Sequence, residues 1–169
     1  MNLLTQNSKL KRTSKALGVR VFNFGIPAYK SASGNVQPAF EKRYQLSKTD
    51  DFVHSMIDEI MKKKPDYIRV HDSGDYYSKK YLQKWLDIAA IHPNIKFYSY
   101  TNCVEMLKNV DLPDNYDIIY SDSGKQKAMI DQSVDRHTKI FHSHTELVSS
   151  GYVDASKIDL YATKWFNKD

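Results

Sequence analysis

The sequence predicts an α/β protein with a parallel sheet of about five to six strands, arranged as an open sheet or as a partial (βα) barrel. Segments of strand character alternate along the chain with segments of helical periodicity. Strands separated by helices form parallel sheets, because each helix returns the chain to the same end of the sheet. The repeating units are short and their helices are unequal in length, which favours the partial barrel.

The predicted strands are short, largely apolar segments that end in polar or glycine-containing turns. The first alternates apolar with polar residues and stops at Gly25 and Pro27. The strands are expected at Val19–Pro27, Tyr67–Asp75, Ile95–Thr101, Tyr116–Gly124 and Lys139–His144.

The clearest predicted helix follows a cap at Ser47 or Thr49 and ends at Pro65. Acidic residues begin it, lysines end it, and its apolar residues recur at helical spacing. A second clear helix starts after the cap residue Ser78 and ends at His92. Weaker helices are expected from a cap at Asn35 to Leu46, near Val104–Asn109, from about Gln126 to Gln132, in a turn between Thr145 and Gly151, and at Ala155–Tyr161 after the cap Asp154.

The 169 residues suit a single α/β domain at residues 19–169, preceded by a basic lead-in at residues 1–18. The net charge is +5, and six cations precede the first acidic residue, Glu41. Those cations are Lys9, Lys11, Arg12, Lys15, Arg20 and Lys30. A mobile cationic arm can contact phosphates, so the candidate nucleic-acid-binding residues are Lys9, Lys11, Arg12 and Lys15. The alternative is that this charged run is simply solvated.

Composition and hydropathy exclude several classes of protein. Apolar residues make up 41% of the chain and charged residues 27%, and no apolar run approaches the length of a membrane span. The first residues lack the apolar stretch of a signal peptide. The only cysteine, Cys103, cannot form an internal disulfide and is expected to be an ordinary buried thiol. We therefore expect a cytoplasmic protein with no membrane partner.

Candidate site residues are expected at the carboxyl ends of the strands, because the loops of parallel α/β folds converge there. Polar groups follow every predicted strand. They are Asn23 after the first, His71, Asp72, Ser73 and Asp75 after the second, Tyr100, Thr101 and Asn102 after the third, Ser121, Asp122 and Ser123 after the fourth, and His142 and His144 on the fifth.

The densest of these segments is the turn "HDSGD", and a related "SDSGK" follows the fourth strand. One interpretation is a ligand-binding turn in which Gly74 lets backbone N–H groups approach a ligand and Asp72 and Asp75 bind it. The other is that these carboxylates only cap a helix or bond within the turn. The many tyrosines are open to a similar choice between stacking on a base and packing in the core.

A metal site is the second chemical hypothesis. His142 and His144 alternate on a predicted strand, so their imidazoles point the same way and can share a metal ion. Asp72, Asp75 or Asp122 would supply a further ligand. This arrangement would suit a metal-dependent hydrolase or nuclease; the alternative is a pair of surface histidines.

Several stretches of the chain resemble the phage and mobile-element family called gene product 88. The most specific is "RVHDSGDYYS…YLQKW", and "LLTQNSKLKRTSKALGVRVFNFGIPAYKS", "FYSYT", "SDSGKQ" and "GYVDASKIDL" add to it. The family is similar to radical S-adenosylmethionine proteins. That similarity implies a radical-SAM-like partial barrel, a four-iron cluster in the loop after the first strand, and a cofactor-facing turn. The residues implied to face the cofactor are Ser73, Gly74 and Asp75, with Asn23 and Tyr100 as further candidates.

The sequence departs from the family at the cluster loop, which reads only "YKSASGNVQPAF". A four-iron cluster needs about three or four thiolates, and this loop has none. We therefore expect a binding protein on a radical-SAM-like scaffold, with a nucleotide, a nucleic acid or a protein as its partner and S-adenosylmethionine as a residual ligand. The alternatives are the metal-dependent hydrolase or nuclease, and a radical SAM enzyme from which the cluster loop was deleted.

Overall fold

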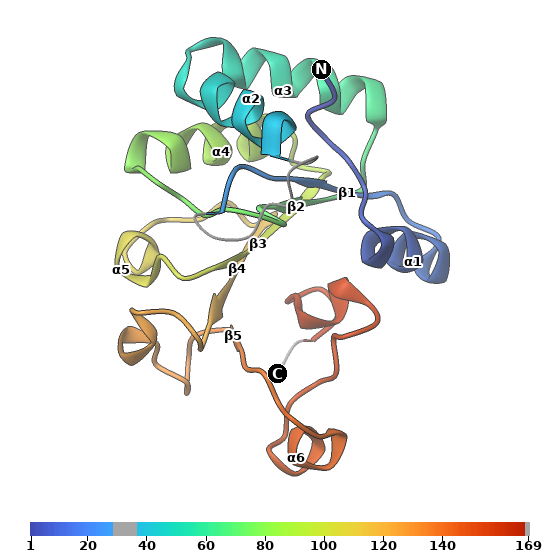
Figure 1. Ribbon diagram of the computed structural model, residues 1–169, viewed down its shortest axis with the longest axis vertical. Helices are drawn as coiled ribbons and strands as arrows, with labels where there is room; N and C mark the ends of the chain where they lie inside the picture. Colours follow the sequence, from blue (N-terminus) through green and yellow to red (C-terminus); the bar gives the residue numbers. More distant parts are fainter. Residues whose placement is uncertain (29–36, 168–169) are drawn as a thin grey trace.

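A computed structural model describes residues 1–28 and 37–167. Its five strands form one parallel sheet in which the order across the sheet, β1-β2-β3-β4-β5, is the order along the chain. The strands are β1 (Val21–Phe24), β2 (Tyr67–Val70), β3 (Lys96–Thr101), β4 (Tyr116–Ser121) and β5 (His137–Thr138). The predicted α/β class and parallel sheet are confirmed (Figure 1).

Helices connect the strands from β1 to β4, as the alternating pattern predicts, whereas only a 3-10 turn lies between β4 and β5. The α-helices are α1 (Ser8–Leu17), α2 (Gln37–Lys48), α3 (Asp51–Lys63), α4 (Lys79–Ile91), α5 (Val104–Leu107) and α6 (His144–Ser149). Two 3-10 turns, η1 (Lys127–Met129) and η2 (Asp159–Ala162), follow β4 and α6. In Figure 1, α2, α3 and α4 lie on one side of the sheet, and α1 and the C-terminal segment lie on the other.

The larger core lies between the sheet and the helices α3 and α4. Alternate strand residues such as Phe24 and Ile68 face Phe52, Met56 and Trp85, and all five are 0% exposed. The Phe24 ring meets Phe52 and Trp85 edge-on at centroid distances of 5.6 and 5.2 Å. Burial of these large apolar side chains contributes most of the free energy of folding.

The opposite face of the sheet, here called the inner face, is half apolar and half polar. Its apolar part joins Leu10 of α1 to Val21, Tyr98 and Leu160, each 0% exposed. The same face carries charged or polar side chains in the middle of strands, including Arg69. Two separate segments, α1 and the residues around η2, cover this face, and Arg69 reaches Asp159 of η2 beneath them.

The predicted basic lead-in is a docked helix. Asn7 caps α1 through a hydrogen bond from Leu10 N to its Oδ1 (2.9 Å), and Gly18 ends it in the left-handed conformation. Residues before the helix lie along the outer edge of β1, where Thr5 and Asn23 form an antiparallel bridge. The lead-in therefore packs on the sheet rather than extending from it as a mobile arm.

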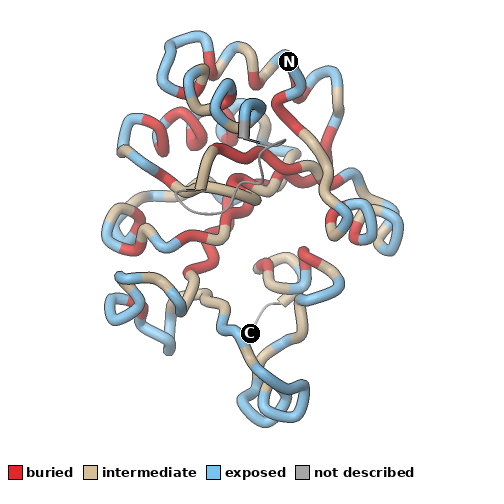
Figure 2. The backbone as a smooth tube through the Cα atoms, in the orientation of Figure 1, coloured by how far each residue is buried: buried red, intermediate tan, exposed pale blue. Residues whose placement is uncertain are grey.

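The prediction for the last part of the chain is wrong in detail. The segment predicted as a fifth strand, Lys139–His144, is not a strand: β5 is His137–Thr138, and His144 begins α6 after the cap residue Ser143. The predicted helix Ala155–Tyr161 is limited to the turn η2. Side chains between β5 and η2 are mostly exposed or half-buried (Figure 2). Helices in proteins are stabilised mainly by tertiary packing, so this segment has little to hold it in a regular helix.

Other boundaries depend on local hydrogen bonds. Ser78 caps α4 by accepting from Tyr81 N at 3.1 Å, as predicted. Ser47 and Thr49 do not cap α3, which follows Asp50, because the Ser47 hydroxyl is bonded to Tyr44 O and Tyr77 OH. The expected cap Asn35 and most of the loop that departs from the family lie outside the described residues. Within the described ranges, no helix is both long and apolar enough to span a membrane.

Candidate functional site

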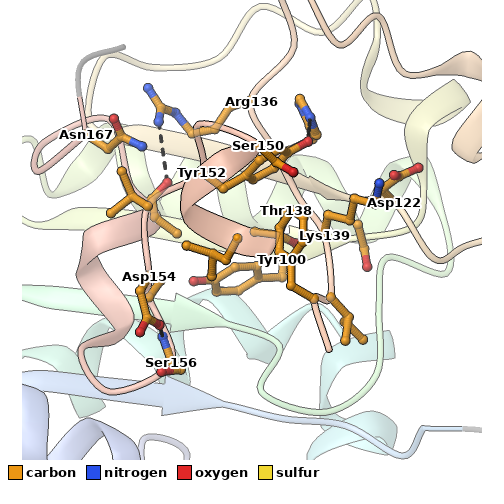
Figure 3. Close-up of a pocket in the computed structure, with 18 of the residues that line it drawn as sticks. Tyr100, Asp122, Arg136, Thr138, Lys139, Ser150, Tyr152, Asp154, Ser156 and Asn167 are labelled. Carbon is orange, nitrogen blue, oxygen red and sulfur yellow. Dashed lines mark hydrogen bonds between the residues drawn. The ribbon is translucent and has the colours of Figure 1, made fainter. Parts of the chain in front are cut away.

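A cavity of about 1220 Å³ lies at the carboxyl ends of β3, β4 and β5. Tyr100, Ser121 to Ser123 and Thr138 line its sheet side. Residues from Lys139 to Ser156, together with Arg136, form the facing wall (Figure 3). We call this cavity the inner pocket. It occupies the edge of the sheet where the sequence predicts the site, because the loops after parallel strands meet there.

A buried carboxylate holds the base of the inner pocket together. Asp159 is 0% exposed, and its carboxylate accepts from Lys9 Nζ at 3.0 Å, Arg69 Nη1 at 3.1 Å and Tyr98 OH at 2.6 Å. Its backbone N–H donates to Thr13 Oγ1 at 3.0 Å. One residue of the C-terminal segment thus joins α1, β2 and β3.

Arg69 is the central cation of this base. Burial alone would lower its pKa, but Asp159 and the neighbouring tyrosines raise the pKa above its usual value, so the guanidinium stays charged. The guanidinium lies 4.7 Å from the centre of the Tyr100 ring, a cation–π distance. Its buried Nε has no hydrogen-bond partner within the described residues. With Lys9 and Arg69 opposing Asp159, two positive charges face one negative charge at the base.

The sheet wall of the inner pocket is the turn after β4. Asp122 N donates to Thr138 O at 2.9 Å, and the hydroxyls of Ser121 and Ser123 are 2.9 Å apart. Asn102 lies so close to Gly124 that a Cβ there would overlap its side chain. This second "DSG" turn therefore packs tightly on the loop after β3, and it presents two hydroxyls and a carboxylate at the pocket.

The facing wall is held to β5 by one aromatic pair. His137 Nε2 and Tyr152 OH are 2.5 Å apart, and His137 Nδ1 lies 2.8 Å from Asp135 O. The Tyr152 ring also meets Phe141 edge-on at 4.9 Å. Figure 3 shows that Tyr100 and Tyr152 both line this cavity.

In the "HDSGD" turn, Gly74 and Asp75 have structural roles. The Asp75 carboxylate accepts from Thr101 Oγ1 at 2.6 Å, Asn102 N at 2.8 Å and Tyr76 N at 2.8 Å. Gly74 adopts a φ of +82°, and a Cβ there would overlap Ile26. None of Ser73, Gly74 and Asp75 lines the inner pocket. These groups tie neighbouring loops to one another.

Asp72 and Asn23 form a separate pair near β1. The Asn23 amide donates to Asp72 Oδ2, and Thr5 Oγ1 donates to Asn23 Oδ1 at 2.9 Å. Burial raises the pKa of Asp72, while the positive charges of Arg69 and Arg43 oppose that rise. The lining of the inner pocket includes neither residue.

His71 is a buried neutral histidine on the helix-covered side of the sheet. Its Nε2 lies 2.8 Å from Tyr81 OH, and its Nδ1 has no partner within the described residues. Burial lowers the pKa of His71 to about 3. It does not line the inner pocket, and it stays uncharged at neutral pH.

This burial predicts an acid-dependent loss of stability. An unfolded histidine has a pKa near 6.5, so below that pH the unfolded chain binds a proton that folded His71 does not. The stability of the protein should therefore fall as the pH drops from about 6.5 towards 3, by up to about 1.4 kcal/mol per pH unit from this group. In urea unfolding measured from pH 7 to pH 4, the difference in free energy of unfolding between the parent and His71→Asn should shrink at this rate.

His54, whose side chain is 82% exposed, provides the control for this measurement. The His54→Asn variant removes a histidine from the surface and should not reproduce the loss expected for His71→Asn. A constant difference for His71→Asn would show that folded His71 titrates like an exposed histidine.

The two histidines of the metal hypothesis are not paired on a strand. His142 is exposed in the loop after β5, and His144, at the start of α6, lies 4.0 Å from Asp154. Both line the inner pocket with Asp122, whereas Asp72 and Asp75 do not. Among residues 1–28 and 37–167, no group of three or more His, Cys, Asp or Glu side chains is placed to hold a metal ion.

The donor set does not fit the four-iron cluster that the family resemblance implies. The chain has one cysteine, whereas such a cluster needs about three or four thiolates. Burial raises the pKa of Cys103 to about 11, and its thiol donates to Tyr76 O at 3.2 Å. Cys103 is a thiol of intermediate exposure, where the sequence predicts a buried one, and no step through a cluster follows from this chain.

Sequence reasoning finds one wall of the inner pocket but, of its base, only Lys9, which it selects as a candidate phosphate contact. Tyr100, Asp122, His142 and His144 are predicted site residues that line it. The base residues Arg69 and Asp159 are not predicted. The signal that could have found the base is the arginine inside the short strand "YIRV". A charged side chain in a buried strand usually has a partner of opposite charge.

The model of the family described as gene product 88 matches residues 3–165 of the chain. This match confirms the family that the "HDSGDYYS" region resembles. It gives no support to a likeness with radical S-adenosylmethionine proteins. No curated protein and no solved structure matches the chain.

Proposed function

The chain belongs to the gene product 88 family, and we propose that it is a binding protein for a nucleotide-sized anion held in the inner pocket. The observation that carries this proposal is the cavity of about 1220 Å³ with a net positive base. Pockets for drug-sized ligands usually measure about 300–1,000 Å³, so this one has room for a nucleotide.

The chemistry of the lining supports the same ligand class. Arg69 and Lys9 outnumber Asp159 at the base. The cations Arg136 and Lys139 on the facing wall are balanced by the other lining carboxylates, Asp122, Asp135 and Asp154, so the positive charge is concentrated at the base. The hydroxyls of the β4 turn and the Asp122 carboxylate suit the hydroxyl groups of a sugar. Tyr100 and Tyr152 offer rings to a base.

Calorimetric titration with nucleoside mono- and triphosphates tests the proposal, with S-adenosylmethionine added as the ligand that the family resemblance implies. Ser123→Trp, which adds bulk at an exposed lining position, should abolish binding. Lys139→Gln should weaken binding about tenfold through loss of a charged contact. Both positions are peripheral to the core, so the variants should unfold at the same temperature as the parent.

Lys62→Gln is the matched control, because Lys62 is exposed on α3 on the other side of the sheet. It removes the same charge and should leave the dissociation constant unchanged. Absence of heat and of any thermal shift with every ligand at millimolar concentration would overturn the proposal. Equal weakening by Lys62→Gln and Lys139→Gln would show that binding depends on net charge and not on the pocket.

A further inference from the structure

Helix α1 presents a face of positive charge that carries no compensating acid. The helix reads "SKLKRTSKAL", and no acidic residue occurs before Glu41. Lys11, Arg12 and Lys15 are exposed, and they make no ion pair with any other described residue. We call these three residues the basic face of α1.

The position of the basic face is fixed by the packing of the opposite side of the helix. Leu10 and Thr13 are 0% exposed against the inner face of the sheet. Ser14 Oγ accepts from Val21 N at 3.1 Å, and Thr13 Oγ1 accepts from Asp159 N at 3.0 Å. The cations therefore lie on a docked scaffold, and a ligand that contacts them does not have to order the helix.

The basic face is continuous with the inner pocket through Lys9. Lys9, Arg12 and Lys15 follow one another at intervals of three residues, so they form a row of neighbouring side chains on the helix. Lys9 begins this row, lines the pocket and contacts Asp159 at its base. Lys11 lies beside the row, one turn before Lys15.

We infer that the ligand of the inner pocket is the end of a single-stranded nucleic acid, whose following phosphates lie along the basic face of α1. This inference rests on the proposed function, and it adds a polymer to the nucleotide in the pocket. A row of cations leading out of a pocket with aromatic rings matches the way single strands are bound, through phosphate contacts and base stacking. An anionic membrane fits less well, because the apolar side of α1 is buried and cannot insert into lipid.

Fluorescence anisotropy with a 5′-phosphorylated oligo(dT) of about twelve nucleotides tests the inference on the full chain. The triple variant Lys11→Gln, Arg12→Gln, Lys15→Gln should lower the slope of log Kd against log salt concentration by about 2. Each of the three lost phosphate contacts contributes about 0.7 to that slope. That change corresponds to affinity about 100-fold weaker at 0.1 M salt and about tenfold weaker at 0.3 M. Binding of a mononucleotide to the same variant should stay unchanged.

The control triple is Lys42→Gln, Lys62→Gln, Lys79→Gln, which removes three exposed cations from α2, α3 and α4. It should bind the oligonucleotide as the parent does, and Ser123→Trp should weaken the oligonucleotide along with the mononucleotide. Equal affinity of the parent for oligonucleotide and mononucleotide would overturn the inference and leave the proposed function standing.

The remaining outcomes separate the two proposals. One outcome is that the oligonucleotide binds through α1, that Ser123→Trp leaves its affinity unchanged, and that no mononucleotide binds. This outcome would overturn the pocket function and place the strand elsewhere. Equal loss in both triple variants would overturn a specific role for α1. Binding to vesicles with about 30% phosphatidylserine without binding to the oligonucleotide would favour a membrane surface instead.

Discussion

Asp159→Ala should lower the free energy of unfolding by about 3–5 kcal/mol, because it removes one partner of a buried charge cluster. Asp159 is 0% exposed, and its loss leaves Lys9 and Arg69 facing each other without an anion. The apparent melting temperature should fall by about 8–15 °C for a domain of this size. Urea or thermal unfolding followed by circular dichroism measures both quantities.

Two further variants identify the cause of this loss. Asp159→Asn keeps the shape and one accepting oxygen for Lys9 and Arg69 but removes the charge and the acceptor for Tyr98 OH, so it should recover part of the stability. Asp111→Ala removes an exposed carboxylate that makes no hydrogen bond or ion pair with the described residues, and it should leave the melting temperature unchanged. If Asp159→Ala unfolds like the parent, the C-terminal segment does not depend on this cluster, and the base of the inner pocket is organised differently.

Gly74→Ala should cost about 3 kcal/mol, the second largest effect expected. Gly74 has a φ of +82°, and a Cβ there would overlap Cγ1 of Ile26 and come to 3.0 Å from its carbonyl oxygen. The left-handed conformation costs an alanine about 1–2 kcal/mol, and displacement of the loop after β1 adds about 1–3 kcal/mol. Denaturant unfolding at neutral pH measures the sum.

Gly18→Ala separates these two contributions. Gly18 has a similar φ of +66°, but a Cβ there would have no atom within 4 Å. Its substitution should therefore cost only about 1–2 kcal/mol. Equal costs at Gly18 and Gly74 would contradict the close packing of the "HDSGD" turn on Ile26.

The parts of the fold with strong periodicity could be predicted from the sequence. β1 to β4 lie within their predicted segments, and Ser78 caps α4 as expected. The helix in the lead-in was not predicted, because cations dominate the pattern of this segment and only Leu10 and Thr13 are fully buried in α1. After β5, few side chains are buried, so periodicity carries little information and Lys139–His144 was misassigned.

The site could be predicted only where it follows from strand ends. Asp122 and Tyr100 follow from that rule, and both line the inner pocket. The same rule selects Asp75, whose carboxylate is used entirely within the protein, because strand ends also need groups that hold the loops in place. Asp159 lies outside any predicted strand end, and its role depends on contacts with residues 90 and 146 positions away.

The contact between Lys9 and Asp159 joins two ends of the chain that the ribosome makes at different times, so this part of the fold can form only late in synthesis. A ribosome adds residues from the N-terminus at about 5–20 per second, so α1 and the first strands emerge well before residue 159. Until then, Lys9 and Arg69 lack their anion, and the inner face of the sheet is open. The pocket is thus completed after the rest of the domain, and nascent chains that stop before η2 would expose a cationic, half-apolar surface to chaperones.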